Sequence, residues 1–213
     1  MAFFASLPGT ASTARFDALA SGDTIASGAS TEGLTFHYDF GGVGLIATDG
    51  TAADAGGAFD TTSAPNFLGT NDLDVLVDGD DLVLDFAPMR ALGLFVVSAE
   101  TPGVSLFDGD IRLAVGGATA SLDIDDVQAT LADGSRVYFL GVIDPAATFD
   151  SASLGTFGGG GAFAFNVDDV VTAVPEPGFV ETLIAGGIVL SRTSRRRRRR
   201  SIVHPLEEST WSA

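Results

Sequence analysis

The chain contains no cysteine and no lysine, and only two of its 213 residues are histidine. Without cysteine it can form no disulfide framework and perform no thiol chemistry. Nucleophilic catalysis of the Ser-His-Asp kind needs a histidine base, and only His37 lies in the main body, because His204 is close to the C-terminus. His37 stands between Phe36 and Tyr38, a setting typical of an ordinary strand histidine.

Glutamate and tryptophan are also scarce. Before residue 175 the only glutamates are Glu32 and Glu100, and nothing in the spacing of the 22 aspartates marks the carboxylate pair that a glycosidase needs. There is no G-x-S-x-G nucleophile motif. The single tryptophan, Trp211, lies near the end, so a sugar-binding face would have to use phenylalanine, Tyr38 or Tyr138. These absences predict a protein that is not an enzyme.

The acidic and basic residues are divided along the chain. Residues 1–174 contain 24 acidic residues and four arginines, a net charge of −20, whereas residues 175–213 carry +3. A body this acidic repels nucleic acid and anionic lipid headgroups, so we expect no nucleic-acid partner. The charge suits either solubility outside the cell or the binding of cations.

The body shows the pattern of an all-β fold. Short apolar runs, several of them alternating with period two, are interrupted every 8–12 residues or so by Gly, Asp-Gly or Pro. Expected strands include 34–38, 81–86, 92–97, 104–107, 137–142 and 163–167. With 46% hydrophobic residues the chain has enough apolar material for one core, so residues 1–173 are predicted to form a β-sandwich.

The C-terminal part has a different character. Val174-Pro175-Glu176-Pro177 is followed by an apolar stretch, 178–191, and then by six consecutive arginines from Arg195 to Arg200. The apolar stretch would make about 21 Å of helix, short against a hydrocarbon core of about 30 Å, but flanking arginines can extend it by snorkelling. We expect one membrane helix at about 178–192, with the arginines and the tail 201–213 in the cytoplasm and the body outside.

Two other interpretations of this segment remain. Six arginines alone could be a nucleic-acid or nuclear-targeting patch, which the acidic body disfavours. The apolar stretch could also be a buried core helix that precedes a charged tail.

Residues 174–200 resemble the bacterial PEP-CTERM sorting signal, because the Pro-Glu-Pro triplet, the apolar segment and the arginine block occur in that order. The resemblance implies that an exosortase-type membrane enzyme is a partner, and that the protein is held in the inner membrane as a precursor before it reaches the cell surface or the extracellular space. It also implies an association with exopolysaccharide or biofilm. The residues that would form the signal are Pro175, Glu176, Pro177, Arg195, Arg196, Arg197, Arg198, Arg199 and Arg200.

An exported protein needs a signal peptide, and none is visible here. The first residues, Met1 to Pro8, are weakly apolar and have no positively charged start, since the first arginine is Arg15. Either the true start of the protein lies upstream, or the chain is not exported. Because the C-terminal signal would have no use in the cytoplasm, we expect the upstream start.

The body resembles the β-sandwich ectodomains common among PEP-CTERM proteins, on the runs 16–22, 33–36, 91–95, 138–142 and 163–170. The resemblance implies a jelly-roll-like fold in which the first and last strands lie side by side and hold a structural calcium ion. Asp17 and Asp168 are then candidate ligands, and Asp169 is a weaker one, since calcium prefers carboxylate and carbonyl oxygens. The alternative is that these are exposed turn aspartates.

The sequence thus predicts an exported, non-catalytic surface or matrix protein with a structural or adhesive role. The first alternative is a calcium-dependent carbohydrate-binding module, and the second is a surface hydrolase.

Overall fold

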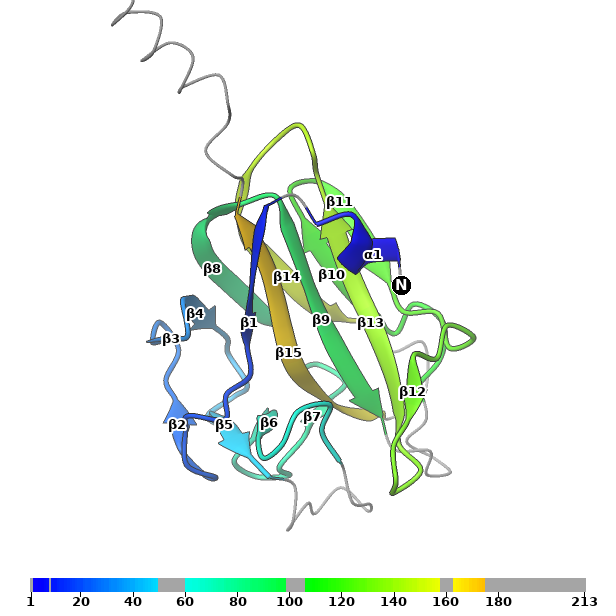
Figure 1. Ribbon diagram of the computed structural model, residues 1–213. Coiled ribbons are helices and arrows are strands. Elements are labelled where there is room, and N and C mark those ends of the chain that lie inside the picture. Colours follow the sequence, from blue (N-terminus) through cyan, green and yellow to red (C-terminus); the bar gives the residue numbers. More distant parts are fainter. Residues whose placement is uncertain (1, 8, 50–59, 99–105, 158–162, 175–213) are drawn as a thin grey trace, which may run out of the picture. The chain divides into compact units, whose positions relative to one another are not determined.

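The computed structural model describes residues 2–7, 9–49, 60–98, 106–157 and 163–174, which fold into two antiparallel sheets and one short helix, α1 (Ala2–Ala5). Figure 1 shows the strands of one sheet in front of those of the other. The two sheets enclose one main hydrophobic core, as in a β-sandwich. The all-β prediction is therefore confirmed.

The larger sheet has the strand order β12-β13-β9-β15-β6-β5-β2, and β1 and β7 also pair with β15. Its strands are β1 (Thr10–Ala14), β2 (Thr24–Ile25), β5 (Leu45–Thr48), β6 (Phe67–Thr70), β7 (Leu76–Val77), β9 (Ala91–Ser98), β12 (Ala129–Thr130), β13 (Arg136–Ile143) and β15 (Ala164–Val174).

The smaller sheet has the order β11-β10-β14-β8-β4-β3. Its strands are β3 (Ser30–Thr31), β4 (Leu34–His37), β8 (Leu82–Met89), β10 (Ile111–Val115), β11 (Ala118–Ser121) and β14 (Phe149–Thr156).

The core is built by alternation along the strands. In β8, for example, Leu82, Leu84 and Phe86 are buried, whereas Val83 and Asp85 face solvent. The largest fully buried side chains are phenylalanines from both halves of the chain: Phe16, Phe36, Phe67, Phe163 and Phe165. Burial of such rings supplies much of the stabilisation of a sandwich.

Strand β15 is the centre of the larger sheet. It pairs with β9 on one side, and on the other side with β6 and β7 near its start and with β1 near its end. The register between β15 and β9 shifts between Asp168 and Val171, where Asp169 has a φ of 47°. Such a bulge adds one residue, so Phe165, Val167 and Val170 all reach the core although strict alternation would place Asp169 there.

No helix within the described residues is long and apolar enough to cross a membrane. The predicted membrane helix at about 178–192, the sorting residues 175–200 and the tail 201–213 lie outside the described residues.

We expect Gly69→Ala to destabilise the protein. Gly69 lies in β6 where the chain turns back towards β7, and an added Cβ would overlap the backbone carbonyl of Asp74, which cannot swing away as a side chain could. The free energy of unfolding should fall by about 2–3 kcal/mol, as for other overpacked sites, in urea denaturation. In the matched control, Gly44→Ala, the nearest atom is an Asn71 side-chain nitrogen at 3.3 Å, so a clearly smaller loss is expected.

Candidate functional site

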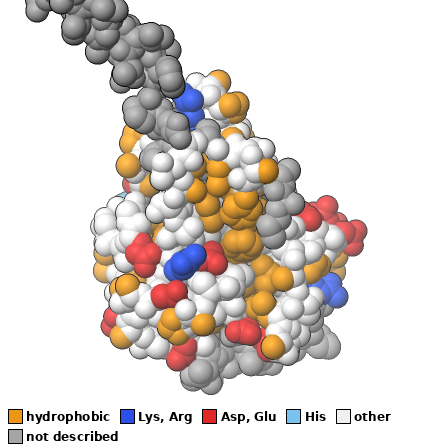
Figure 2. All heavy atoms as spheres, in the orientation of Figure 1, with side chains coloured by type: hydrophobic (Ala, Val, Ile, Leu, Met, Phe, Trp, Pro, Cys, Tyr) orange, Lys and Arg blue, Asp and Glu red, His pale blue; other side chains and the backbone are white. Residues whose placement is uncertain are grey.

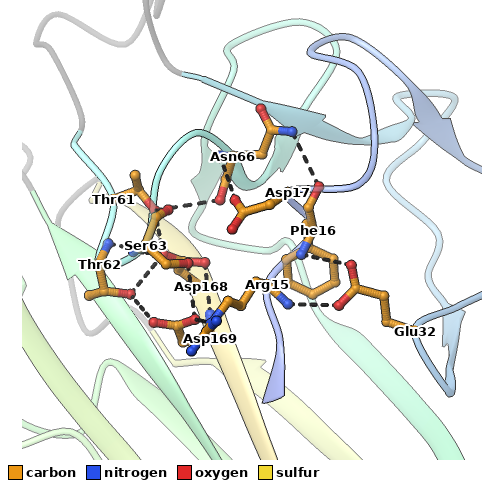
Figure 3. A network of polar contacts seen from close by, with 10 residues as sticks. All are labelled: Arg15, Phe16, Asp17, Glu32, Thr61, Thr62, Ser63, Asn66, Asp168 and Asp169. Atoms are coloured by element: carbon orange, nitrogen blue, oxygen red, sulfur yellow. Dashed lines mark hydrogen bonds and ion pairs between the residues drawn. The ribbon is translucent and has the colours of Figure 1, made fainter. Parts of the chain in front are cut away.

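The most connected polar group among the described residues is the carboxylate of Asp168 in β15 (Figure 3). Its Oδ2 accepts hydrogen bonds from Thr62 N (2.9 Å), Thr62 Oγ1 (2.7 Å) and Ser63 N (2.9 Å), and Thr61 Oγ1 also donates to it. Its Oδ1 accepts from the backbone N–H of Asp169 at 2.8 Å. The segment 61–63 is thereby fastened to the centre of the larger sheet.

Asp169 extends the network towards β1. Its carboxylate accepts hydrogen bonds from Thr62 Oγ1 (2.9 Å) and Ser63 Oγ (3.0 Å), and its Oδ1 lies 3.5 Å from Arg15 Nε. The Arg15 side chain is 61% exposed, so solvent screens this ion pair and it contributes little to stability.

Asp17 binds Asn66, which follows the segment 61–63 in the same loop before β6. Its Oδ1 accepts from Asn66 N at 3.2 Å, while Asn66 Nδ2 donates to the carbonyls of Phe16 (3.2 Å) and Leu19 (2.7 Å). The carboxylate of Glu32 accepts from the backbone N–H of Arg15 (2.8 Å) and of Phe16 (3.1 Å). These bonds fix the turn that follows β1, in which Phe16 has a φ of 62°.

Burial controls the ionisation of Asp168, whose relative exposure is 0%. Loss of solvation raises the pKa of this carboxyl above its ordinary value, and the nearby Asp169 carboxylate raises it further. The hydrogen bonds from Thr61, Thr62 and Ser63 act in the opposite direction without cancelling the effect of burial.

The hydroxyl groups in this network face more acceptors than they have hydrogens. Thr61 Oγ1 lies 2.6 Å from the carbonyl oxygen of Ser63 and 3.4 Å from that of Asn66, in addition to its contact with Asp168. Thr62 Oγ1 lies between the two aspartate carboxylates. A threonine hydroxyl has a single hydrogen to donate, so the surplus of oxygen atoms fits either a bound cation or a proton on Asp168.

The structure brings the two predicted calcium ligands to one loop but not into direct contact. Asp17 reaches it through Asn66, and Asp168 through Thr61, Thr62 and Ser63. The expected pairing of the first and last strands is present, with Thr10 opposite Val174 and Ala14 opposite Val170. Over the described ranges, no group of three or more Asp, Glu or His side chains is arranged to hold a metal ion. The sorting residues lie outside these ranges.

Sequence reasoning missed Thr61, Thr62, Ser63 and Asn66. They lie in a short stretch with no metal-binding or catalytic spacing, and their aspartate partners are 49 to 107 residues away along the chain. No local pattern could have identified them. His37 ends β4 as a strand residue, and its Nε2 lies 3.1 Å from Asp85 Oδ2 on the exposed face of the smaller sheet.

No protein-family model matches the chain, and no curated protein matches it. Among solved structures, the chain is similar to the K2 cleaved adhesin domain of Lys-gingipain, with 17% sequence identity and a TM-score of 0.46. The match covers 78% of this chain and 98% of that one. At this level the likeness carries no argument about function, which has to be inferred from the chain itself.

We expect Asp168→Ala to lower the free energy of unfolding by about 3 kcal/mol, because it leaves the backbone N–H groups of Thr62 and Ser63 without their acceptor. Asp125 is exposed, so Asp125→Ala is a suitable control with an expected change below about 0.5 kcal/mol.

Without added metal, the stability difference between wild type and Asp168→Ala should widen as pH falls. The pKa of Asp168 is higher in the folded state than in the unfolded chain, so the wild type gains stability as the pH falls through the folded-state pKa. The gain is complete once the pH is below 3.8, the ordinary pKa of an aspartate. Asp168→Ala lacks this carboxyl and does not gain. A difference independent of pH would contradict the raised pKa.

Proposed function

We propose that residues 1–173 form an exported, non-catalytic sandwich of jelly-roll-like type that works at the bacterial cell surface or in the extracellular matrix. Residues 174–200 act as its sorting signal, which an exosortase-type enzyme in the inner membrane recognises. The role of the body is structural or adhesive, in association with exopolysaccharide or biofilm.

The observation that carries this proposal is the position of the triplet relative to the fold. Strand β15, which lies at the centre of the larger sheet, ends at Val174, directly before the triplet in the sequence. The first compact unit of the chain spans Met1–Glu176. A cut at Pro175-Glu176-Pro177 would therefore release the sandwich with all its described strands, as a sorting reaction requires.

The roles of the acidic side chains support a non-catalytic body. Many aspartates accept hydrogen bonds from backbone N–H groups in turns, the ordinary structural use of this residue. Each acceptor aspartate and the residue whose N–H it binds are Asp23 and Ala20, Asp80 and Val77, Asp110 and Phe107, Asp133 and Ser135, and Asp144 and both Ala146 and Ala147. A surface hydrolase is the weaker alternative, and turnover of a glycoside or ester that one aspartate substitution abolishes would favour it.

A calcium-dependent carbohydrate-binding module is the second candidate function. The surplus of oxygen atoms around Thr61 and Asp168 is compatible with a calcium ion, which accepts six to eight oxygen ligands, as well as with a proton on Asp168. A separate hollow of about 230 Å³ on the smaller sheet has Val83 and Ala114 beside the hydroxyls of Ser151 and Ser153. This combination of apolar and hydroxyl surface suits one sugar ring.

The two tyrosines of the body do not support this second candidate. Tyr138 is 3% exposed, and the hydroxyl of Tyr38 donates to the carbonyl of Ile25 at 2.7 Å while its ring stacks on Phe40. Neither tyrosine is placed as an open platform for a sugar.

The sorting proposal predicts that replacing Pro175, Glu176 and Pro177 by alanine leaves the protein uncut in the inner membrane. The measurement is intact mass in membrane and surface fractions after expression from the native locus, where any upstream signal is retained. Glu207→Ala/Glu208→Ala changes the chain beyond the arginines and should be processed like the wild type. Release of the triple variant to the surface at the wild-type mass would refute the proposal.

The calcium proposal predicts saturable heat in calorimetric titration of the metal-free protein and a higher melting temperature with calcium. At 100 times the dissociation constant, binding would add about 2.7 kcal/mol of stability. Asp168→Ala should abolish both effects, while the control Asp125→Ala retains them. The test uses about 10 mM calcium, well above the affinity range of extracellular calcium modules. If neither heat nor a thermal shift is observed there, the calcium proposal is wrong, and a proton on Asp168 explains the surplus of oxygen atoms.

A further inference from the structure

The outer face of the smaller sheet contains a row of side chains that crosses four strands. Ala114 of β10 lies opposite Ser153 of β14. Ser153 lies opposite Val83 of β8, which in turn lies opposite His37 of β4. Three strand spacings make this row about 14 Å long. The hollow of about 230 Å³ lies on the row, with Ala114, Ser153 and Val83 in its lining, so the face extends beyond the hollow.

Hydroxyl groups on this face are not used by the protein itself. Ser151 and Ser153 of β14 are exposed and line the hollow. Thr119 and Ser121 are exposed in the neighbouring edge strand β11. In the part of the chain that the structure describes, none of these four hydroxyls has a hydrogen-bond partner. Each can therefore donate to and accept from a ligand that itself carries hydroxyls.

An exposed aromatic ring lies beside the hollow. Phe157 directly follows β14 and is 52% exposed. A Cβ added at Gly155 would lie 3.0 Å from the Phe157 ring, so this glycine leaves room for the ring on the sheet. Gly155 is two residues from Ser153 in the same strand, a distance of about 7 Å. The ring and the hollow are therefore adjacent places on one face.

Arg112 adds hydrogen-bond donors next to this ring. Its Cζ lies 4.2 Å from the centroid of Phe157, and its Nε donates to the carbonyl of Gly109 at 3.1 Å. These contacts hold the guanidinium in place. Over the described ranges no carboxylate forms an ion pair with it, so its terminal N–H groups are available to a ligand.

Charge restricts the class of ligand. All residues that line the hollow are uncharged, and the nearby His37 Nε2 lies 3.1 Å from Asp85 Oδ2. Residues 1–174 as a whole carry −20, which repels an anionic chain. The combination of free hydroxyls, small apolar surface and one open ring therefore fits an uncharged glycan better than an acidic one.

The outer face of the larger sheet is a contrasting surface. Figure 2 shows a band of apolar side chains where Figure 1 places α1, β9 and β13. There Phe3 and Phe4 pack against Phe139, at centroid distances of 4.8 Å and 5.1 Å, and Phe95 packs against the same ring at 5.0 Å. These rings already contact one another, which leaves the face of the smaller sheet as the better glycan surface.

We propose that the outer face of the smaller sheet binds an uncharged polysaccharide chain, with one sugar ring in the hollow and another against Phe157. Ser151 and Ser153 exchange hydrogen bonds with the first sugar, and Arg112 donates to hydroxyl oxygens of the second. The inference deepens the second candidate function, a carbohydrate-binding module, and rests on it. Neither Asp168 nor the sorting signal takes part.

Calorimetric titration of the full chain, with calcium present throughout, tests the ligand class. The probes are cellohexaose, laminarihexaose, mannohexaose and maltohexaose, with an alginate hexamer as the acidic probe. At least one uncharged hexasaccharide should bind saturably, and the alginate hexamer at least about tenfold more weakly because of charge repulsion. The disaccharide of the same sugar should also bind at least about fivefold more weakly, because it cannot reach both places. Preference for alginate would overturn the uncharged class.

Two exposed positions test the site itself with the hexasaccharide that binds. Phe157→Ala removes the ring and should weaken binding at least about fivefold, whereas Phe157→Tyr keeps a ring and should bind like the wild type. Ser153→Gln puts a longer side chain in the hollow and should weaken binding by a similar factor. Ser12→Gln makes the same change at an exposed serine of β1 and is the matched control.

The outcomes separate this site from the function on which it rests. Wild-type affinity in either Phe157→Ala or Ser153→Gln would overturn the site, while the carbohydrate-binding module would stand on another surface. If no probe binds at all, both the site and the module are wrong. The sorting proposal is unaffected in either case, since the intact mass in membrane and surface fractions tests it independently.

Discussion

The fold depends on the last strand, β15, which is joined to four other strands at once. It pairs with β9 along one edge and with β6, β7 and β1 along the other. Because β15 ends at Val174, the larger sheet cannot close until almost the whole body of the chain is available. Contacts between such distant segments form slowly. A protein that crosses a membrane before it folds would gain from this order, and the proposed sorting signal begins where the closing strand stops.

The central strand also contains two consecutive carboxylates, which is costly inside a sheet. The bulge at Asp169 keeps that side chain out of the core, and the segment 61–63 brings donors to Asp168 from more than a hundred residues away. A buried carboxylate without partners would destabilise the strand by several kcal/mol. The hydrogen bonds from residues 61–63 therefore allow β15 to hold a buried carboxylate at the centre of the sheet.

The sequence predicted the fold where the apolar pattern is local. The runs 81–86, 92–97 and 137–142 correspond to β8, β9 and β13. β8 alternates between buried and exposed residues, whereas β9 is buried at nearly every position and is marked by a continuous apolar run. Strand β11 gives no such signal, since Ala118–Ser121 is an edge strand with mostly exposed, weakly apolar residues. The expected strand 104–107 is wrong at residues 106 and 107, the part of it that the structure describes. These residues are not in a strand, and Phe107 N donates to the Asp110 carboxylate in a turn.

The candidate site could be predicted only in part, for a related reason. Asp17 and Asp168 were indicated by the expected pairing of the first and last strands, which the structure has. Their actual partners, Thr61, Thr62, Ser63 and Asn66, are set by tertiary contacts that no spacing shows. The glycines illustrate the same limit. Many mark turns as expected, but Gly69, Gly93 and Gly141 lie inside strands and make room for other parts of the chain.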